Sequence, residues 1–162
     1  MIKRTLALII ALMLGLCTNY AMVLAEKAEF VKNGGFEFLN ADNTPQNWKV
    51  LGAEGLWSVS KDVKSGENAL CLKSDSENVS LTQTINITGG SEYTFTAHLK
   101  SLKINGSGAQ VKVEFYNGDS AISTVVKENY TDISNKYEAK VITFNSPAEA
   151  TRANLLVRLL GG

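Results

Sequence analysis

The sequence predicts an all-β fold, a two-sheet β-sandwich of the jelly-roll type, and three observations carry that prediction. Beyond residue 26, apolar and polar residues alternate with period two in successive runs, which is typical of strands with one buried face. Turn-forming glycine, asparagine and serine residues separate these runs at short intervals. No amphipathic helix of useful length interrupts them, and strands of this number and spacing suit a jelly roll.

Residues 1–25 resemble an export signal and are not expected to join the fold. Two basic residues precede an apolar run at 6–16, and the segment ends in small residues at Ala25. The run is shorter than the ~20 residues that a membrane span requires, so cleavage is favoured over a membrane anchor. We therefore expect a secreted domain of residues 26–162, free of the membrane.

The first strand of the secreted domain is expected at 29–38. Phe36 and Phe38 alternate there with Glu37, which indicates one apolar face. A polar loop follows, in which the fixed φ of Pro45 suits a turn. The full set of expected strands is 29–38, 47–51, 55–60, 68–74, 78–87, 92–102, 109–117, 121–127, 137–145 and 152–160.

Parity along three of these strands predicts which side chains face the core, because successive residues of a strand point to opposite faces. The inward sets are Tyr93, Phe95, Ala97 and Leu99; Val111, Val113 and Phe115; and Ala153, Leu155, Val157 and Leu159. The outward sets are Thr94, Thr96, His98 and Lys100; Lys112, Glu114 and Tyr116; and Asn154, Leu156, Arg158 and Leu160.

Charge and cysteine content exclude several functions. The secreted domain carries 14 lysine and arginine residues, which is 16 less Lys3 and Arg4, against 16 aspartate and glutamate residues. This balance argues against binding to nucleic acid or to an acidic membrane surface. Cys71 is the one cysteine left, so the domain forms no internal disulfide, and with a single histidine it lacks a usual zinc ligand set.

Several motifs, in order along residues 30–160, resemble the carbohydrate-binding modules of the CenC-like group, families 4, 9 and 22. They are Asn33, Gly35, Phe36 and Glu37; Pro45 and Trp48; Ser65, Gly66, Ala69, Leu70 and Leu72; Gln83–Ile85; Gly90–Tyr93; and Phe144–Ala148. The resemblance implies a galactose-binding-domain-like jelly roll that binds a polysaccharide such as xylan, β-glucan or a cellulose-like chain. It further implies a glycoside hydrolase as the parent or associated protein.

Sugar recognition needs a flat aromatic surface for the apolar face of a pyranose ring, and planar polar groups for its hydroxyls. Tyr116 meets the first need from an outward position, and Trp57 is the second aromatic candidate. Glu114, Arg158 and His98 are candidates for the second need. Each has a structural alternative: Trp57 as a core residue, Tyr116 as a strand-end residue, and His98 as a solvated strand residue.

The resemblance also implies a structural calcium ion near the N-terminal segment. Calcium takes six to eight oxygen ligands, and here Glu37 would give a carboxylate while Gly35 and Lys64 would give carbonyls. The alternative is that Glu37 is only a solvated carboxylate. Relatives continue past the position of Gly162 into a final strand that carries an aspartate, so we expect this sandwich to lack its C-terminal strand.

Three functions remain open: a secreted carbohydrate-binding module, a structural or adhesive sandwich without a sugar site, and a small enzyme. The chain has no G-x-S-x-G, H-E-x-x-H or P-loop motif. A glycosidase needs two carboxylates across a cleft, and no local cluster indicates such a pair. We therefore expect the domain itself to bind an oligosaccharide or polysaccharide and to leave catalysis to a fused or associated domain.

Overall fold

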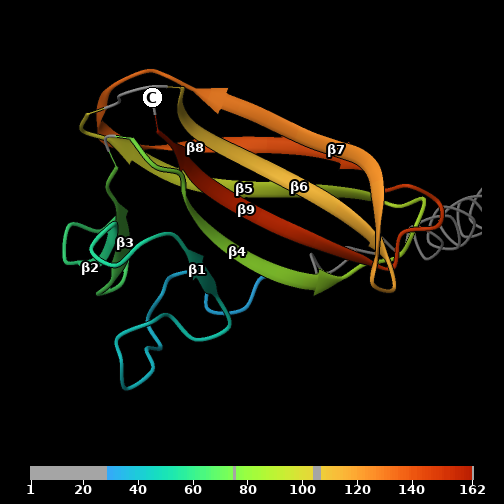
Figure 1. Ribbon diagram of the computed structural model, residues 1–162, viewed down its shortest axis with the longest axis horizontal. Coiled ribbons are helices and arrows are strands. Elements are labelled where there is room, and N and C mark those ends of the chain that lie inside the picture. Colours follow the sequence, from blue (N-terminus) through green and yellow to red (C-terminus); the bar gives the residue numbers. More distant parts are fainter. Residues whose placement is uncertain (1–28, 75, 104–106, 162) are drawn as a thin grey trace, which may run out of the picture.

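A computed structural model describes residues 29–74, 76–103 and 107–161, so the predicted export signal lies outside the described residues. The described part consists of strands and loops, and it contains no helix that is long and apolar enough to cross a membrane. The strands, labelled in Figure 1, are β1 (Lys49–Leu51), β2 (Trp57–Ser60), β3 (Ala69–Leu72), β4 (Val79–Asn86), β5 (Glu92–Ser101), β6 (Gly108–Asn117), β7 (Ser120–Tyr130), β8 (Ser134–Asn145) and β9 (Arg152–Leu160).

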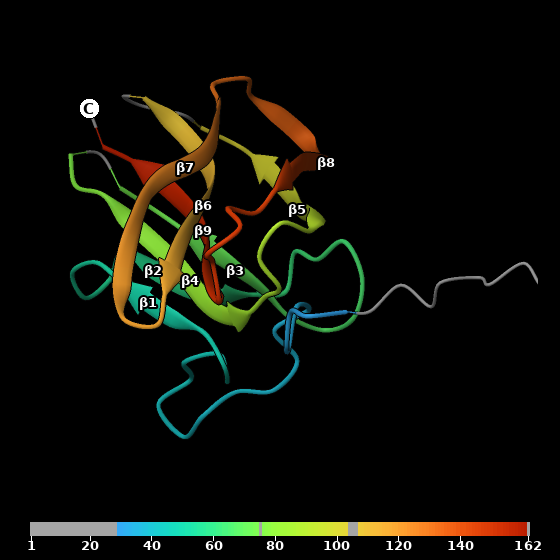
Figure 2. The same ribbon diagram turned by 90° about the vertical axis from the view of Figure 1, so that its right-hand side faces the viewer.

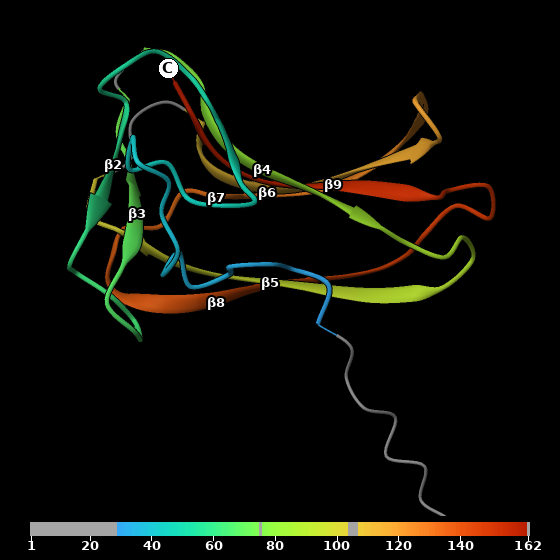
Figure 3. The same cartoon turned by 90° about the horizontal axis from the view of Figure 1, so that it is seen from below.

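The strands form two facing layers, seen from two sides in Figures 2 and 3. One layer is a five-stranded antiparallel sheet in the order β1-β4-β9-β6-β7. The other layer contains the pair β5-β8, and the β2-β3 hairpin lies at one end of the sandwich (Figure 3). Strands far apart in sequence are neighbours, such as β4 with β9. This arrangement confirms the predicted all-β, two-sheet jelly-roll sandwich.

The core lies between the layers and follows the predicted parity. Val111, Val113 and Phe115 of β6 are fully buried, and Phe144 of β8 packs on Phe115 with 5.5 Å between the ring centroids. Burial of a side chain of this size contributes about 1.5–3 kcal/mol. The inward row of β6 therefore anchors the strand whose opposite side carries the candidate site.

A buried glutamine ties the N-terminal segment to the five-stranded sheet. The side-chain oxygen of Gln83 accepts a hydrogen bond from the N–H of Lys32 at 2.7 Å, and its amide nitrogen donates to the Lys32 carbonyl at 2.8 Å. These bonds satisfy a buried amide, which would otherwise cost about 1–3 kcal/mol. The segment before Asn33 is thereby fixed beside β4.

The strand predicted at 29–38 is absent, and that prediction was wrong. Asn33 and Phe36 have left-handed backbone conformations, with φ of 51° and 60°, which no regular strand accommodates. The side chain of Asn33 bonds the loop instead, because its Nδ2 donates to the carbonyl of Phe38 and its Oδ1 accepts from the N–H of Phe38. Trp48 closes the loop by donating its indole N–H to the Asn33 carbonyl at 3.0 Å.

A β-bulge shapes the sheet where the candidate site lies. The register of β6 with β7 shifts between Glu114 and Tyr116, and such bulges bend a strand and increase its twist. Gly118, with φ of 55°, supplies the left-handed conformation that the following turn requires. Figure 3 shows the β6-β7 hairpin bending away from the β5-β8 layer, which makes this end of the sheet concave on its outer side.

Candidate functional site

The predicted binding residues belong to the side of the five-stranded sheet that faces away from β5 and β8. In the register of β4, β9 and β6, inward residues lie opposite inward residues on the neighbouring strand. The residues that alternate with them along each strand therefore point outward together. We call this surface the outer face. Its members are Ser80, Thr82, Thr84, Gln110, Lys112, Glu114, Tyr116, Arg152, Asn154, Leu156 and Arg158.

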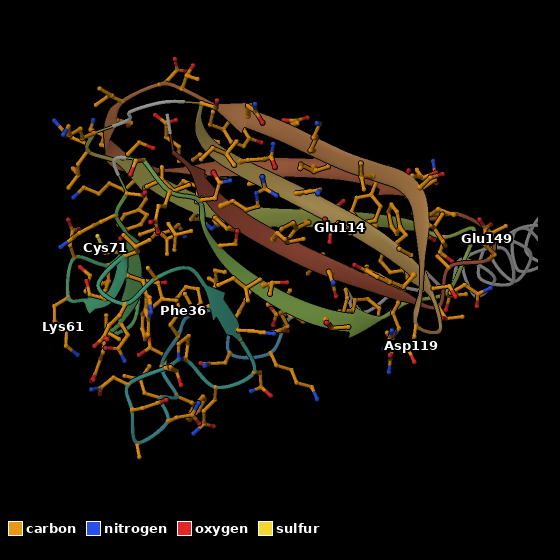
Figure 4. All side chains as sticks on the ribbon, in the orientation of Figure 1. Phe36, Lys61, Cys71, Glu114, Asp119 and Glu149 are labelled. Atoms are coloured by element: carbon orange, nitrogen blue, oxygen red, sulfur yellow. The ribbon has the colours of Figure 1, made fainter. Side chains whose placement is uncertain are left out.

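Tyr116 and Glu114 form the centre of a polar network on the outer face. The Tyr116 hydroxyl donates to Glu114 Oε2 at 3.4 Å, and the Lys112 ammonium pairs with Glu114 Oε1 at 2.5 Å. Both side chains are half-buried, and Figure 4 shows Glu114 in the middle of the sheet. Burial, and then the charge of Glu114, raise the pKa of Tyr116. The hydroxyl therefore stays protonated, and able to donate, throughout the neutral range.

Two neighbours across the strands complete this network. Asn154 lies opposite Glu114 in the register, and its side-chain oxygen accepts a hydrogen bond from the Thr84 hydroxyl at 2.6 Å. Its proximity to the Tyr116 hydroxyl slightly offsets the rise in the pKa of that tyrosine. Arg152 lies opposite Tyr116, with its guanidinium carbon 6.0 Å from the ring centroid. A row of polar side chains thus runs across three strands and brings an aromatic ring, an amide and a carboxylate together.

The guanidinium of Arg152 is itself held by the turn after β6. It pairs with Asp119 at 2.8 Å and also donates to the carbonyl of Gly118. A cation at this distance over a tyrosine ring is attracted by the negative ring face. The contact orders the ring of Tyr116 and also covers part of one face of it.

Arg158 lies on the outer face but not beside Tyr116. It stands four residues beyond Asn154 on β9, which is about 13 Å along the strand. Leu156 lies between them and is only 7% exposed. In the described part of the chain, the buried Nε of Arg158 has no hydrogen-bond partner.

Arg152 and Asn154 are immediate neighbours of the tyrosine that were not predicted from the sequence. The outward parity of Asn154 was visible in the sequence, but the residue opposite Tyr116 is set by the register of β6 with β9. These strands are separated by more than thirty residues, so no local pattern reports their register.

The remaining two candidates lie elsewhere in the sandwich. Trp57 is in β2, half-buried and opposite Leu72 in the hairpin. His98 is in β5 of the other layer, opposite Ala139. Partial burial, and then the charge of Lys64, lower the pKa of His98. The structure therefore brings Tyr116, Glu114 and Arg158 onto one face and leaves Trp57 and His98 outside it.

The carboxylate of Glu37 accepts hydrogen bonds from backbone N–H groups of a turn about thirty residues later. Its carboxylate oxygens accept the N–H of Glu67 at 3.1 Å and of Asn68 at 3.4 Å. Gly35 lies close by, but among the residues described no three histidine, cysteine, aspartate or glutamate side chains converge on a metal position. Calcium prefers a shell of oxygen ligands, so the calcium site stays a prediction from the resemblance.

No protein-family model matches the chain, and no curated protein sequence matches it. Among solved structures, the chain is similar to the enzymatically active domain of tailspike protein 4 from bacteriophage CBA120, with a TM-score of 0.65 and 18% identity. The match covers 82% of this chain and 19% of the phage chain, so this chain spans a small part of that protein. The likeness shows a shared fold.

Two sugar complexes are similar at lower TM-scores. A family 61 carbohydrate-binding module in complex with β-1,4-galactotriose has a TM-score of 0.49 and 20% identity, over 81% of this chain and 86% of its own. The CBM22-1 and GH10 modules of Clostridium thermocellum endo-1,4-β-D-xylanase 10B, complexed with xylohexaose, have a TM-score of 0.49 and 15% identity, over 68% of this chain and 23% of their own.

Proposed function

We propose that this chain is a non-catalytic carbohydrate-binding module whose outer face binds a β-linked polysaccharide such as xylan, β-glucan or a cellulose-like chain. One observation carries the proposal: an aromatic ring, an amide and a carboxylate lie side by side in one row on a curved sheet. These groups belong to Tyr116, Asn154 and Glu114. They match the apolar face and the hydroxyl rim of a pyranose ring.

Each group has a distinct role in the proposed complex. Tyr116 stacks on the apolar face of a sugar, while Glu114 and Asn154 bond its hydroxyls. Their mutual hydrogen bonds hold them in place before binding, which reduces the conformational entropy lost on association. Arg158 lies about 13 Å further along β9, where its guanidinium group contacts another sugar of the same chain.

The outer face supports binding without cleavage. Glycosidases use two carboxylates about 5–9.5 Å apart on either side of the scissile bond. At this site Glu114 is paired with Lys112, and the carboxylate of Asp119, in the turn after β6, is paired with Arg152. Export directed by the signal at 1–25 would place the domain among extracellular polysaccharides. There it would target a fused or associated glycoside hydrolase to its substrate.

A structural or adhesive role is the second candidate. The observation that favours it is the Arg152 guanidinium, which already occupies a position over the Tyr116 ring. In that role the row of polar groups only stabilises the sheet surface, and no glycan is retained by it.

Affinity electrophoresis in soluble xylan, β-glucan and substituted cellulose separates the two candidates. The wild-type protein should be retarded by at least one of these glycans, and Tyr116→Ala should remove the retardation. Loss of aromatic stacking costs about 1–3 kcal/mol, or roughly tenfold to a hundredfold in Kd. Phe38→Ala is the matched control, because Phe38 is a 66% exposed aromatic residue on the N-terminal loop. The proposal would be overturned if no glycan retarded the wild-type protein. It would also be overturned if the Tyr116→Ala variant were retarded as strongly as the wild type.

A further inference from the structure

Positively charged side chains lie beside one another where the outer face extends from β9 and β6 onto β7, three neighbouring strands in Figure 1. Lys127 of β7 lies directly opposite Lys112 of β6. The next residue along β7, Val126, packs against the core, so Lys127 points outward together with Lys112. Arg158 of β9 lies opposite Gln110, two residues from Lys112 along β6. We call Lys112, Lys127 and Arg158 the cationic patch.

The carboxylate beside this patch on the outer face belongs to Glu114, and both of its oxygens are already bonded. Its Oε1 pairs with the ammonium of Lys112 at 2.5 Å, and its Oε2 accepts a hydrogen bond from the Tyr116 hydroxyl at 3.4 Å. Glu114 therefore balances one charge of the cationic patch, and the charges of Lys127 and Arg158 remain.

These two remaining charges have no carboxylate partner within the described ranges of the chain. Neither Lys127, which is exposed, nor Arg158, which is half-buried, forms an ion pair there. Glu128 follows Lys127 on β7, but it lies opposite the inward Val111 and accepts the hydroxyl of Tyr130 on that side of the sheet. Like charges directly opposite each other on neighbouring strands are destabilising. The patch is therefore suited to hold an anion from outside the chain.

We propose that the cationic patch binds the carboxylate of a uronic acid carried by the glycan on the outer face. This inference rests on the proposed function and narrows its ligand class to acidic polysaccharides, such as xylan that carries glucuronic acid side groups. The planar guanidinium group of Arg158 bonds the carboxylate oxygens. The ammonium groups of Lys112 and Lys127 attract the same charge from the neighbouring strands.

The position of the patch agrees with a single glycan chain along the outer face. Lys112 precedes Tyr116 by four residues on β6, which is about 13 Å along the strand. A chain of several sugars that stacks on Tyr116 therefore reaches the patch. In this arrangement Tyr116 binds the backbone of the polysaccharide, and the patch selects chains that carry acidic side groups.

The test compares three forms of one xylan by isothermal titration calorimetry. The first carries its glucuronic acid groups, the second has their carboxyl groups reduced to alcohols, and the third is the reduced form with sulfate esters added to the original charge density. The wild-type protein should bind the acidic form about threefold to tenfold more tightly than the reduced form, the range of two exposed ion pairs. This preference should disappear in 1 M salt, where the Debye length falls to about 3 Å.

The outcomes separate this inference from the proposed function. Equal binding of the acidic and reduced forms would overturn the acidic ligand and leave the proposed function intact. Absence of binding to all three forms would overturn both. Binding of the sulfated form as tightly as the acidic form would show attraction to any polyanion and contradict a site for uronic acid.

A neutral substitution within the patch tests its location. Lys127→Gln should lower the preference for the acidic form about twofold to threefold, because one exposed ion pair is removed. The matched control is Lys136→Gln, which removes the same charge from an exposed position of β8 in the other layer and should keep the wild-type preference. An equal decrease in both variants, or no decrease in Lys127→Gln, would overturn the placement of the uronic acid at the cationic patch.

Discussion

At the scale of single residues, the candidate site depends on contacts that cross from one strand to another. Parity identified Tyr116 and Glu114 as outward residues, and the structure places them together in a network. Parity could not show that Arg152, not Arg158, stands opposite Tyr116, because that neighbour depends on register between distant strands. The sequence therefore predicted which types of side chain form the candidate site better than it predicted how those side chains are arranged.

Glu37 is a second residue whose role depends on a distant segment. Its carboxylate accepts backbone N–H groups from the turn at 66–68, about thirty residues later. A Cβ on Gly66 would collide with this carboxylate, and the φ of +73° at Gly66 also favours glycine. The motif residues Glu37 and Gly66 thus have a structural role that requires no metal.

Glu37→Ala should lower the free energy of unfolding by about 1 kcal/mol, since it removes hydrogen bonds from backbone donors to a charged group. Thermal melts in the presence of chelator would show this loss as a lower Tm. The calcium proposal adds a separate expectation: Ca²⁺ at ~100 times its Kd should stabilise the wild type by about 2.7 kcal/mol and leave the variant unchanged. Identical wild-type melts with Ca²⁺ and with chelator would contradict the calcium proposal alone.

At the scale of the elements, period-two alternation predicted strands well wherever a partner strand was available. Each expected range after 29–38 overlaps a strand of the structure. The range 29–38 failed because its alternation is interrupted by left-handed residues at Asn33 and Phe36, whose side chains serve a loop. Alternation is a local property, whereas a strand also requires extended backbone and a partner edge.

The two faces of β6 should respond differently to truncation. Phe115 is fully buried between the layers, so Phe115→Ala should cost about 3–5 kcal/mol of stability. Tyr116 lies on the outer face, so Tyr116→Ala should leave the free energy of unfolding within about 0.5 kcal/mol of wild type. The loss of its long hydrogen bond to Glu114 is included in that range. Urea unfolding of the two variants measures both values. Equal losses would mean that the outer face is part of the core.

At the scale of the whole molecule, the sandwich has two surfaces with different chemistry. The outer face of the five-stranded sheet is polar and fixed by hydrogen bonds. A cavity between the layers is apolar and bordered by the free edges of β3 and β5. The sequence predicted the fold class but not this cavity, because free edges follow from strand pairing. The expectation that the sandwich lacks a C-terminal strand stays a prediction from the resemblance.

The most direct test of the central claim is to map where a glycan binds by NMR. Uniformly ¹⁵N-labelled protein would be titrated with soluble oligosaccharides of whichever glycan retards it in electrophoresis. The proposed function predicts concentration-dependent shifts of backbone amides at 110–116 and 152–158, with those at 68–74 and 93–103 unchanged. Shifts confined to 68–74 and 93–103, which line the cavity, would contradict the claim that the outer face holds the sugar.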